Sequence, residues 1–194
     1  MCGRLNVIDN PLIEQVCEDL GIRLSVRTNT DLCPTELISS IGADGDAMRQ
    51  LDLSWGIKPS WAKRVLINAQ AETVSTKPTF KQSFLDNRVI VPCSGWYEWA
   101  NINGKKQKYL FKHADDSPIY MAAIALEHNE KVVTLTTKPN DQCRDYHHRM
   151  PLLVDRADVM QWLMGNPLSL GVLLNTNWES PLDISLATNV SRNS

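Results

Sequence analysis

The sequence predicts an α+β fold, in which a curled, barrel-like and mainly antiparallel β core is flanked by a few helices. Three observations support it. Short runs rich in β-branched and aromatic residues fill the chain from Leu37 to Thr137, a strong hairpin signal lies at Asn103-Gly104, and helical patterns lie on either side. At 194 residues, the chain is predicted to form a single domain over residues 1–194.

The predicted strands follow one another at short intervals, which favours a curled sheet. Between two of these runs, Asn103 and Gly104 both accept the positive φ that a tight hairpin turn requires. The runs cover residues 36–41, 49–55, 64–69, 87–93, 96–102, 105–112, 118–126 and 131–137, and a closing strand is predicted within residues 182–190.

A first helix is predicted from Asn10 to Gly21. Asn10 is a suitable cap, Pro11 suits the first helical position, and Gly21 is a terminator. Apolar residues recur on one face and include Cys17, which assigns this thiol to the core.

A second helix is predicted over residues 155–165. Asp155 is its expected cap, Asp158 lies in its first turn, and Gly165 follows its end.

Composition excludes several classes of protein. No apolar stretch is long enough to span a membrane, and the N-terminus lacks a secretion signal, so a cytoplasmic protein is expected. The five cysteines form no CxxC pair and no cluster with His at zinc spacing, so neither a metal nor another cofactor is expected. The net charge of -2 means that any nucleic acid must be held by a local basic patch.

The first four residues, MCGR, combine a thiol and a guanidinium at a chain end. If Met1 is removed, Cys2 carries an α-amine and a thiol on adjacent carbons, and Arg4 can lower the pKa of both. Such a residue can condense with an aldehyde to a thiazolidine ring. It can also attack an amide or ester while its own amine acts as the base, as in N-terminal nucleophile hydrolases. The residues alone leave both reactions open.

Three further segments hold candidate reactive groups. Asn68 follows an apolar run, where it could equally be an ordinary turn residue. Glu98 shares one strand face with Trp96, so it is either a buried acid with a raised pKa or a solvated charge. His147 and His148 are adjacent in a polar loop and are expected to point in different directions. They indicate either a solvated basic loop or an acid–base His beside an anion-binding Arg149.

Taken in order, these segments resemble the SRAP (SOS response-associated peptidase) family of abasic-site processing proteins. The family pattern is MCGR, N-A-R-x-E-T, G-W-[YF]-E-W and H-D-R-M-P, and the chain has MCGR, NAQAET, GWYEW and HHRMP. WGIKPSW and TDLCPTE also look like family segments, and the resemblance extends from Cys2 to about Asn189. It implies an SRAP-like fold.

The resemblance also implies a reaction. Members bind abasic sites in single-stranded DNA, including junctions with duplex, and crosslink the aldehyde of the sugar to the N-terminal Cys without a cofactor. It implies that Cys2 is the nucleophile after self-removal of Met1, that Asn68 positions it, that Glu98 moves protons, and that His147 lies near the sugar and phosphate. The DNA-binding residues that it implies are Arg4, Trp61, Gln70, Trp96, Thr136 and Arg149.

Four positions depart from the family pattern near these motifs. Gln70 replaces an arginine, which predicts a weaker phosphate contact, Asp31 replaces Asn, and His148 replaces Asp. The fourth departure is Cys33, which replaces Ala. We expect a cytoplasmic monomer, of bacterial or phage origin, that associates with the nucleoid when it is bound to DNA. Two alternatives remain, a thiol hydrolase or peptidase and a non-covalent single-strand binding module.

Overall fold

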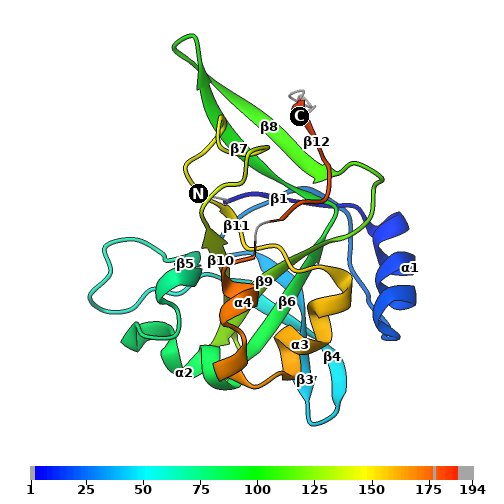
Figure 1. Ribbon diagram of the computed structural model, residues 1–194, viewed down its shortest axis with the longest axis vertical. Helices are drawn as coiled ribbons and strands as arrows, with labels where there is room; N and C mark the ends of the chain where they lie inside the picture. Colours follow the sequence, from blue (N-terminus) through cyan, green and yellow to red (C-terminus); the bar gives the residue numbers. More distant parts are fainter. Residues whose placement is uncertain (1–2, 177, 188–194) are drawn as a thin grey trace.

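The computed structural model describes residues 3–176 and 178–187, which form two β-sheets and several short helices. Figure 1 shows the helices at the side and base of the molecule and a long β-hairpin projecting at the top. The predicted α+β class is confirmed. No helix in the described ranges has the length and apolar character needed to cross a membrane.

The first sheet is antiparallel throughout and contains the projecting hairpin. Its turn residues Asn103 and Gly104 have φ of 53° and 77°, which confirms the predicted hairpin. The strand order is β12 (Leu182–Leu186), β8 (Lys105–His113), β7 (Gly95–Ile102), β1 (Leu5–Val7) and β2 (Asn29–Leu32).

The second sheet is curled. Its order is β11 (Met150–Pro151), β10 (Lys131–Thr137), β4 (Ala47–Trp55), β3 (Leu37–Asp44), β6 (Arg88–Cys93) and β9 (Ile119–Leu126). Because β9 also pairs with β10, the sheet is ring-like. It is not a complete barrel, since β10 meets β4 over only two residue pairs. Every residue of β6 and β9 is buried, so these strands form the centre of the core.

The first predicted helix is confirmed as α1 (Asp9–Leu20), which ends where expected. Gly21 has φ of 66°, and its N–H donates to the Cys17 carbonyl. Its start also fits the prediction, because Asn10 has the extended backbone angles of a cap residue and the regular helix begins at Pro11. Cys17 is half-buried and packs against the core.

The second predicted helix is split in two. A 3₁₀ turn, η2 (Arg156–Asp158), precedes the short helix α3 (Val159–Met164). Asp155 makes no side-chain cap, and its backbone carbonyl instead accepts the Asp158 N–H. Gly165 ends the helix in an extended conformation, with φ of -64°, rather than in the left-handed one.

Several short elements escaped prediction. The longest is α2 (Pro78–Asp86), which starts with proline and buries Phe80 and Phe84, four residues apart. That spacing is a helical signal, although the segment is short and otherwise polar. The others are the strands β1, β2 and β11, the 3₁₀ turns η1 (Ala71–Thr73) and η3 (Pro167–Ser169), and the helix α4 (Gly171–Leu174).

Arg88 explains how α2 and α3 end. Its side chain is buried, and within the part of the chain that the structure describes its guanidinium donates hydrogen bonds only to backbone carbonyls. The acceptors are Phe84 and Leu85 at the end of α2 and Trp162, Leu163 and Gly165 at the end of α3, at 2.6–3.4 Å. Helix C-termini carry unpaired carbonyls and partial negative charge, so one cation stabilises both ends.

Replacing Arg88 with Met should therefore destabilise the fold. The variant keeps much of the side-chain volume but leaves the carbonyls of two helix ends buried without donors, at a cost of about 3 kcal/mol. Urea unfolding followed by circular dichroism measures the loss. Arg49→Met, at an exposed residue of β4, is the control and should change stability by less than about 0.5 kcal/mol. Equal stability of the two variants would contradict this role.

Candidate active site and nucleic-acid interface

The second half of β10 brings two of the predicted motifs together. On one edge it pairs in parallel with β5 (Asn68–Gln70), so that Thr136 lies opposite Gln70. On the other edge it pairs with β11, so that Thr136 lies opposite Pro151. The NAQAET and HHRMP segments therefore flank one residue, Thr136, which the sequence also selected.

Asn68 occupies the first position of β5. Its side chain is half-buried and accepts a hydrogen bond from the Thr134 hydroxyl on β10. Asn68 and Thr134 lie opposite each other on β5 and β10, so strand pairing fixes the position of the Asn68 side-chain amide. Asn68 is therefore not a simple turn residue. Thr134 was not predicted, although its place two residues before Thr136 puts it on the same strand face.

A cavity of about 240 Å³ lies beside these residues. It brings together Asn68, Gln70, Thr136, His148 and Arg149, all of which the sequence singled out. It also exposes Lys77, which was not predicted, and its lining is completed by Ala69 and Phe80. The basic groups favour an anionic ligand.

Arg149 is held rigidly at the edge of this cavity. Its Nη1 and Nη2 atoms lie 2.7 and 2.8 Å from the two carboxylate oxygens of Glu72, and Nη2 also donates to the Thr136 carbonyl. The hydrogen bonds from Arg149 lower the pKa of Glu72. This bidentate geometry orients the guanidinium, and Glu72 joins the site as a positioning residue that was not selected from the sequence.

The two histidines do not point apart as predicted. Their ring centroids lie 4.3 Å from each other, because a turn at residues 141–146, rather than a strand, leads into them. The His147 Nδ1 atom is 3.1 Å from the Arg149 amide nitrogen, and burial lowers the pKa of His147. The ring is therefore mainly neutral at neutral pH and can take part in proton transfer.

Glu98 is buried on β7, on the same face as Trp96. This burial excludes the alternative of a solvated strand charge, and it raises the pKa of the carboxyl to about 7. A group with this pKa can both accept and release a proton near neutrality. Burial also raises the pKa of the Cys143 thiol to about 12, with a contribution from the nearby Glu98 charge.

The loop of residues 140–149 connects Glu98 to the cavity. Tyr146 packs edge-on against Tyr109, the cross-strand neighbour of Glu98, at 4.8 Å between ring centroids. The next residue, His147, donates its amide to the Cys143 carbonyl. The loop therefore packs on the first sheet beside Glu98 and continues into β11 of the second sheet.

The N-terminal segment also reaches this region. The Tyr97 amide donates to the Arg4 carbonyl at 3.0 Å, directly before β1 pairs with β7. The Arg4 Nε atom lies 3.4 Å from an Asp31 oxygen, which is also 2.8 Å from Lys108 Nζ. Cys2, the predicted nucleophile, lies outside the described residues.

Residues 1–186 match the family described as SOS response associated peptidase (SRAP). The chain belongs to the SRAP family.

Curated relatives have consistent names. The chain is 30% identical over 189 residues to the abasic site processing protein YoqW of Bacillus subtilis, covering 84% of this chain and 80% of the relative. It is 34% identical over 116 residues to the abasic site processing protein YedK of Escherichia coli, covering 56% and 52%. A chicken relative, the abasic site processing protein HMCES, is 28% identical over 157 residues, covering 62% and 47%.

Solved structures confirm the SRAP-like fold. A protein of Bordetella bronchiseptica superimposes with a TM-score of 0.79 at 20% identity, covering 96% of this chain and 100% of that one. A phage-related protein of the same species has a TM-score of 0.79 at 21% identity, covering 96% and 94%.

The two tryptophans that the SRAP resemblance assigned to the DNA surface differ in exposure. Trp61 is 67% exposed in the loop between β4 and β5, where its ring is available for stacking. Trp96 is completely buried and stacks on Phe111 at 5.0 Å. Its assignment to a DNA surface is therefore corrected, because its face of β7 packs into the core with Glu98.

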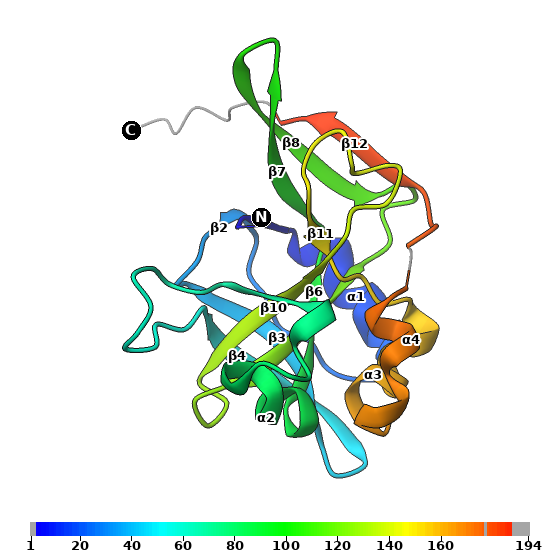
Figure 2. The same ribbon diagram turned by 60° about the vertical axis from the view of Figure 1, so that its left-hand side comes forward.

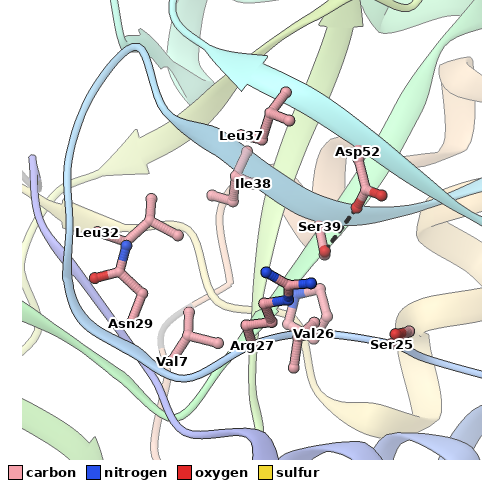
Figure 3. Close-up of a pocket in the computed structure, with 11 residues that line it drawn as sticks. Val7, Ser25, Val26, Arg27, Asn29, Leu32, Leu37, Ile38, Ser39 and Asp52 are labelled. Atoms are coloured by element: carbon pink, nitrogen blue, oxygen red, sulfur yellow. Dashed lines mark hydrogen bonds between the residues drawn. The ribbon is translucent and has the colours of Figure 1, made fainter.

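A larger cavity of about 420 Å³ lies elsewhere in this SRAP chain, beside β3 and residues 25–29. Figure 3 shows Arg27 near it and the Ser39 hydroxyl donating to Asp52, at 2.7 Å. Among the described residues that line it there is no buried carboxylate and no thiol. It shares no described lining residue with the cavity beside Thr136, so it is separate from the candidate site.

The ion pair between Arg149 and Glu72 should give a pH-dependent contribution to stability. Because the pKa of Glu72 is lowered in the folded state, its stabilisation is complete above the ordinary value of 4.5 and disappears as pH falls through the lowered value. Glu72→Gln should lose about 1 kcal/mol at pH 7, after allowance for solvent screening.

Thermal unfolding between pH 3 and 7 measures this difference. The gap between wild type and Glu72→Gln should close at acid pH, whereas the control Glu14→Gln, at an exposed position of α1, should show no gap. A gap that stays constant down to pH 3 would show that the carboxylate charge is not what stabilises the site.

Proposed function

We propose that this SRAP protein processes abasic sites in single-stranded DNA, including sites at junctions with duplex, by forming a covalent crosslink through Cys2. The main support is Glu98, a buried carboxyl with a pKa of about 7 on the strand that pairs with the N-terminal strand. Cys2 precedes Arg4 by two residues, and the Arg4 carbonyl is bonded to Tyr97, next to Glu98. The names of the relatives support the same substrate.

The reaction requires removal of Met1, which frees the α-amine of Cys2. The amine nitrogen and the thiol sulfur each form one bond to C1 of the ring-opened abasic sugar. The aldehyde oxygen leaves as water, and the product is a thiazolidine. No oxidant, reductant or cofactor is needed, but each bond requires a proton transfer, which is the role proposed for Glu98.

The remaining site residues position the DNA. Asn68, fixed by Thr134, orients the sugar and Cys2, and His147 lies on the phosphate side as a neutral imidazole. Arg149 faces the cavity in a fixed orientation and contacts a phosphate, while Thr136 supports it. Gln70 provides a neutral contact where the SRAP pattern has arginine.

Intact-mass analysis followed by reaction with DNA tests the proposal. The mature protein should lack Met1 and should form an adduct with abasic single-stranded DNA that persists on a denaturing gel. Cys2→Ala should form none, although it should still bind the DNA.

Other outcomes would select another function. Adduct formation by Cys2→Ala would rule out the thiazolidine. Retention of Met1 together with reversible binding would support a non-covalent binding module. Cleavage of a peptide that depends on Cys2 and is indifferent to DNA would support a hydrolase.

The role of Glu98 predicts a specific pH profile. If its carboxylate accepts the sugar hydroxyl proton during ring opening, the crosslinking rate should rise as pH increases through about 7. Glu98→Gln should lower the rate by about 10²-fold and lose this rise. Single-turnover gels between pH 5.5 and 8.5 measure both, and an unchanged inflection in Glu98→Gln would assign the titration to another group.

A further inference from the structure

We propose that the face of the β7–β8 hairpin opposite Glu98 binds a second stretch of single-stranded DNA, next to the reacting nucleotide. We call it the hairpin face, and it consists of Trp99, Lys106 and Lys108, with the buried Tyr97 ring beneath Lys108. The inference rests on the proposed function, because it assumes that the bound polymer is DNA.

Strand alternation separates the hairpin face from the reactive one. Glu98 points into the core, so its neighbours Tyr97 and Trp99 point the other way. Trp99 is half-buried and lies directly opposite Lys108 on β8. β7 therefore has an acid on one side and an aromatic surface on the other.

Lysines are packed against these rings. The Lys108 Nζ atom lies 3.9 Å from the ring centroid of Tyr97 and 5.5 Å from that of Trp99. The Lys106 Nζ atom lies 5.8 Å from the Trp99 ring. Aromatic rings among cations are the combination with which proteins hold unpaired bases and their phosphates.

The charge of the hairpin contrasts with that of the chain. Residues 99–114 contain Lys105, Lys106, Lys108 and Lys112 and no Asp or Glu, although the chain has a net charge of -2. Within residues 3–176 and 178–187, no carboxylate forms an ion pair with Lys105 or Lys106. Lys108 is paired with Asp31, and Lys112 with Asp116 and Asp183, so Lys105 and Lys106 supply the local basic patch that a weakly acidic DNA-binding protein requires.

The hairpin face is continuous with the N-terminal segment. Asp31 connects Lys108 to Arg4, and the backbone of Arg4 is bonded to Tyr97. Figures 1 and 2 both show the hairpin extending away from β1, beyond the rest of the molecule. Six residues of β7, from Tyr97 to Ile102, extend over roughly 20 Å, so a strand leaving the site near Arg4 has a surface of several nucleotides to follow.

Binding of undamaged DNA tests this surface independently of crosslinking. Cys2→Ala protein is titrated with fluorescent oligonucleotides of 5 and 15 nucleotides that contain no abasic site, and Kd is measured by anisotropy at several salt concentrations. Trp99→Ala should weaken binding of the longer strand about tenfold through lost stacking. Lys106→Ala should lower the magnitude of the salt slope by about 0.7.

Two controls separate this surface from general effects. Lys131→Ala removes a lysine at the end of β10 away from Thr136. The Kd of each oligonucleotide should stay within twofold of the parent value. The 5-nucleotide strand should bind all variants alike. Thermal unfolding checks that Trp99→Ala is folded. Lys106→Ala, at an exposed position, tests the same surface with a second variant.

Defined outcomes overturn the proposal. It fails if Trp99→Ala and Lys106→Ala bind the longer strand within twofold of the parent, or if Lys131→Ala weakens it equally. Competition by polyglutamate as effective as that by DNA would show a surface for any polyanion and would also overturn it. An absence of crosslinking by the wild type would instead count against the function proposed for Cys2. It would leave the Kd values for undamaged DNA unaffected.

Discussion

The candidate site depends on the way β10 changes partners along its length. Its first residues pair with β4 and β9, and its last residues pair with β5 and β11. This exchange brings Asn68 and Gln70 to one edge of Thr136, and the strand after Arg149 to the other. Backbone hydrogen bonds therefore set the spacing of these side chains, and the side chains themselves supply only their final orientation. A site built in this way is as rigid as the sheet that carries it.

Electrostatics near the site are local rather than global. Arg149 is fixed by Glu72, and Arg4 by Asp31, so the two arginines that the family pattern assigns to DNA phosphates each have an acidic neighbour. These carboxylates reduce the positive field but hold the donors in place, which favours a directed contact over diffuse attraction. The arrangement fits the proposed function, in which one lesion is selected in an abundant polymer.

Local patterns were sufficient for most elements of the fold. Asn103-Gly104 determines its turn by backbone preference alone, and the alternation around Glu98 indicated correctly which residues share its face. Two predictions were wrong because they depend on contacts between residues far apart in the sequence. The helix expected over residues 155–165 is divided, and its last carbonyls turn to Arg88, which is far away in the sequence. The rings of His147 and His148 meet because a turn over residues 141–146, which packs through Tyr146 on Tyr109, leads into them, and no local pattern shows this contact.

The hairpin also has a consequence for how related chains can vary. Its turn at Asn103-Gly104 lies at the free end, away from β1, so residues can be added there without disturbing the strand pairs beside Glu98. Side chains alternate with a period of two, so lengthening each strand symmetrically simply extends both faces. A single residue inserted between Trp96 and Glu98, in contrast, would exchange the faces of Glu98 and Trp99. The length of the hairpin can therefore vary freely, whereas the part of β7 beside Glu98 cannot gain or lose a single residue.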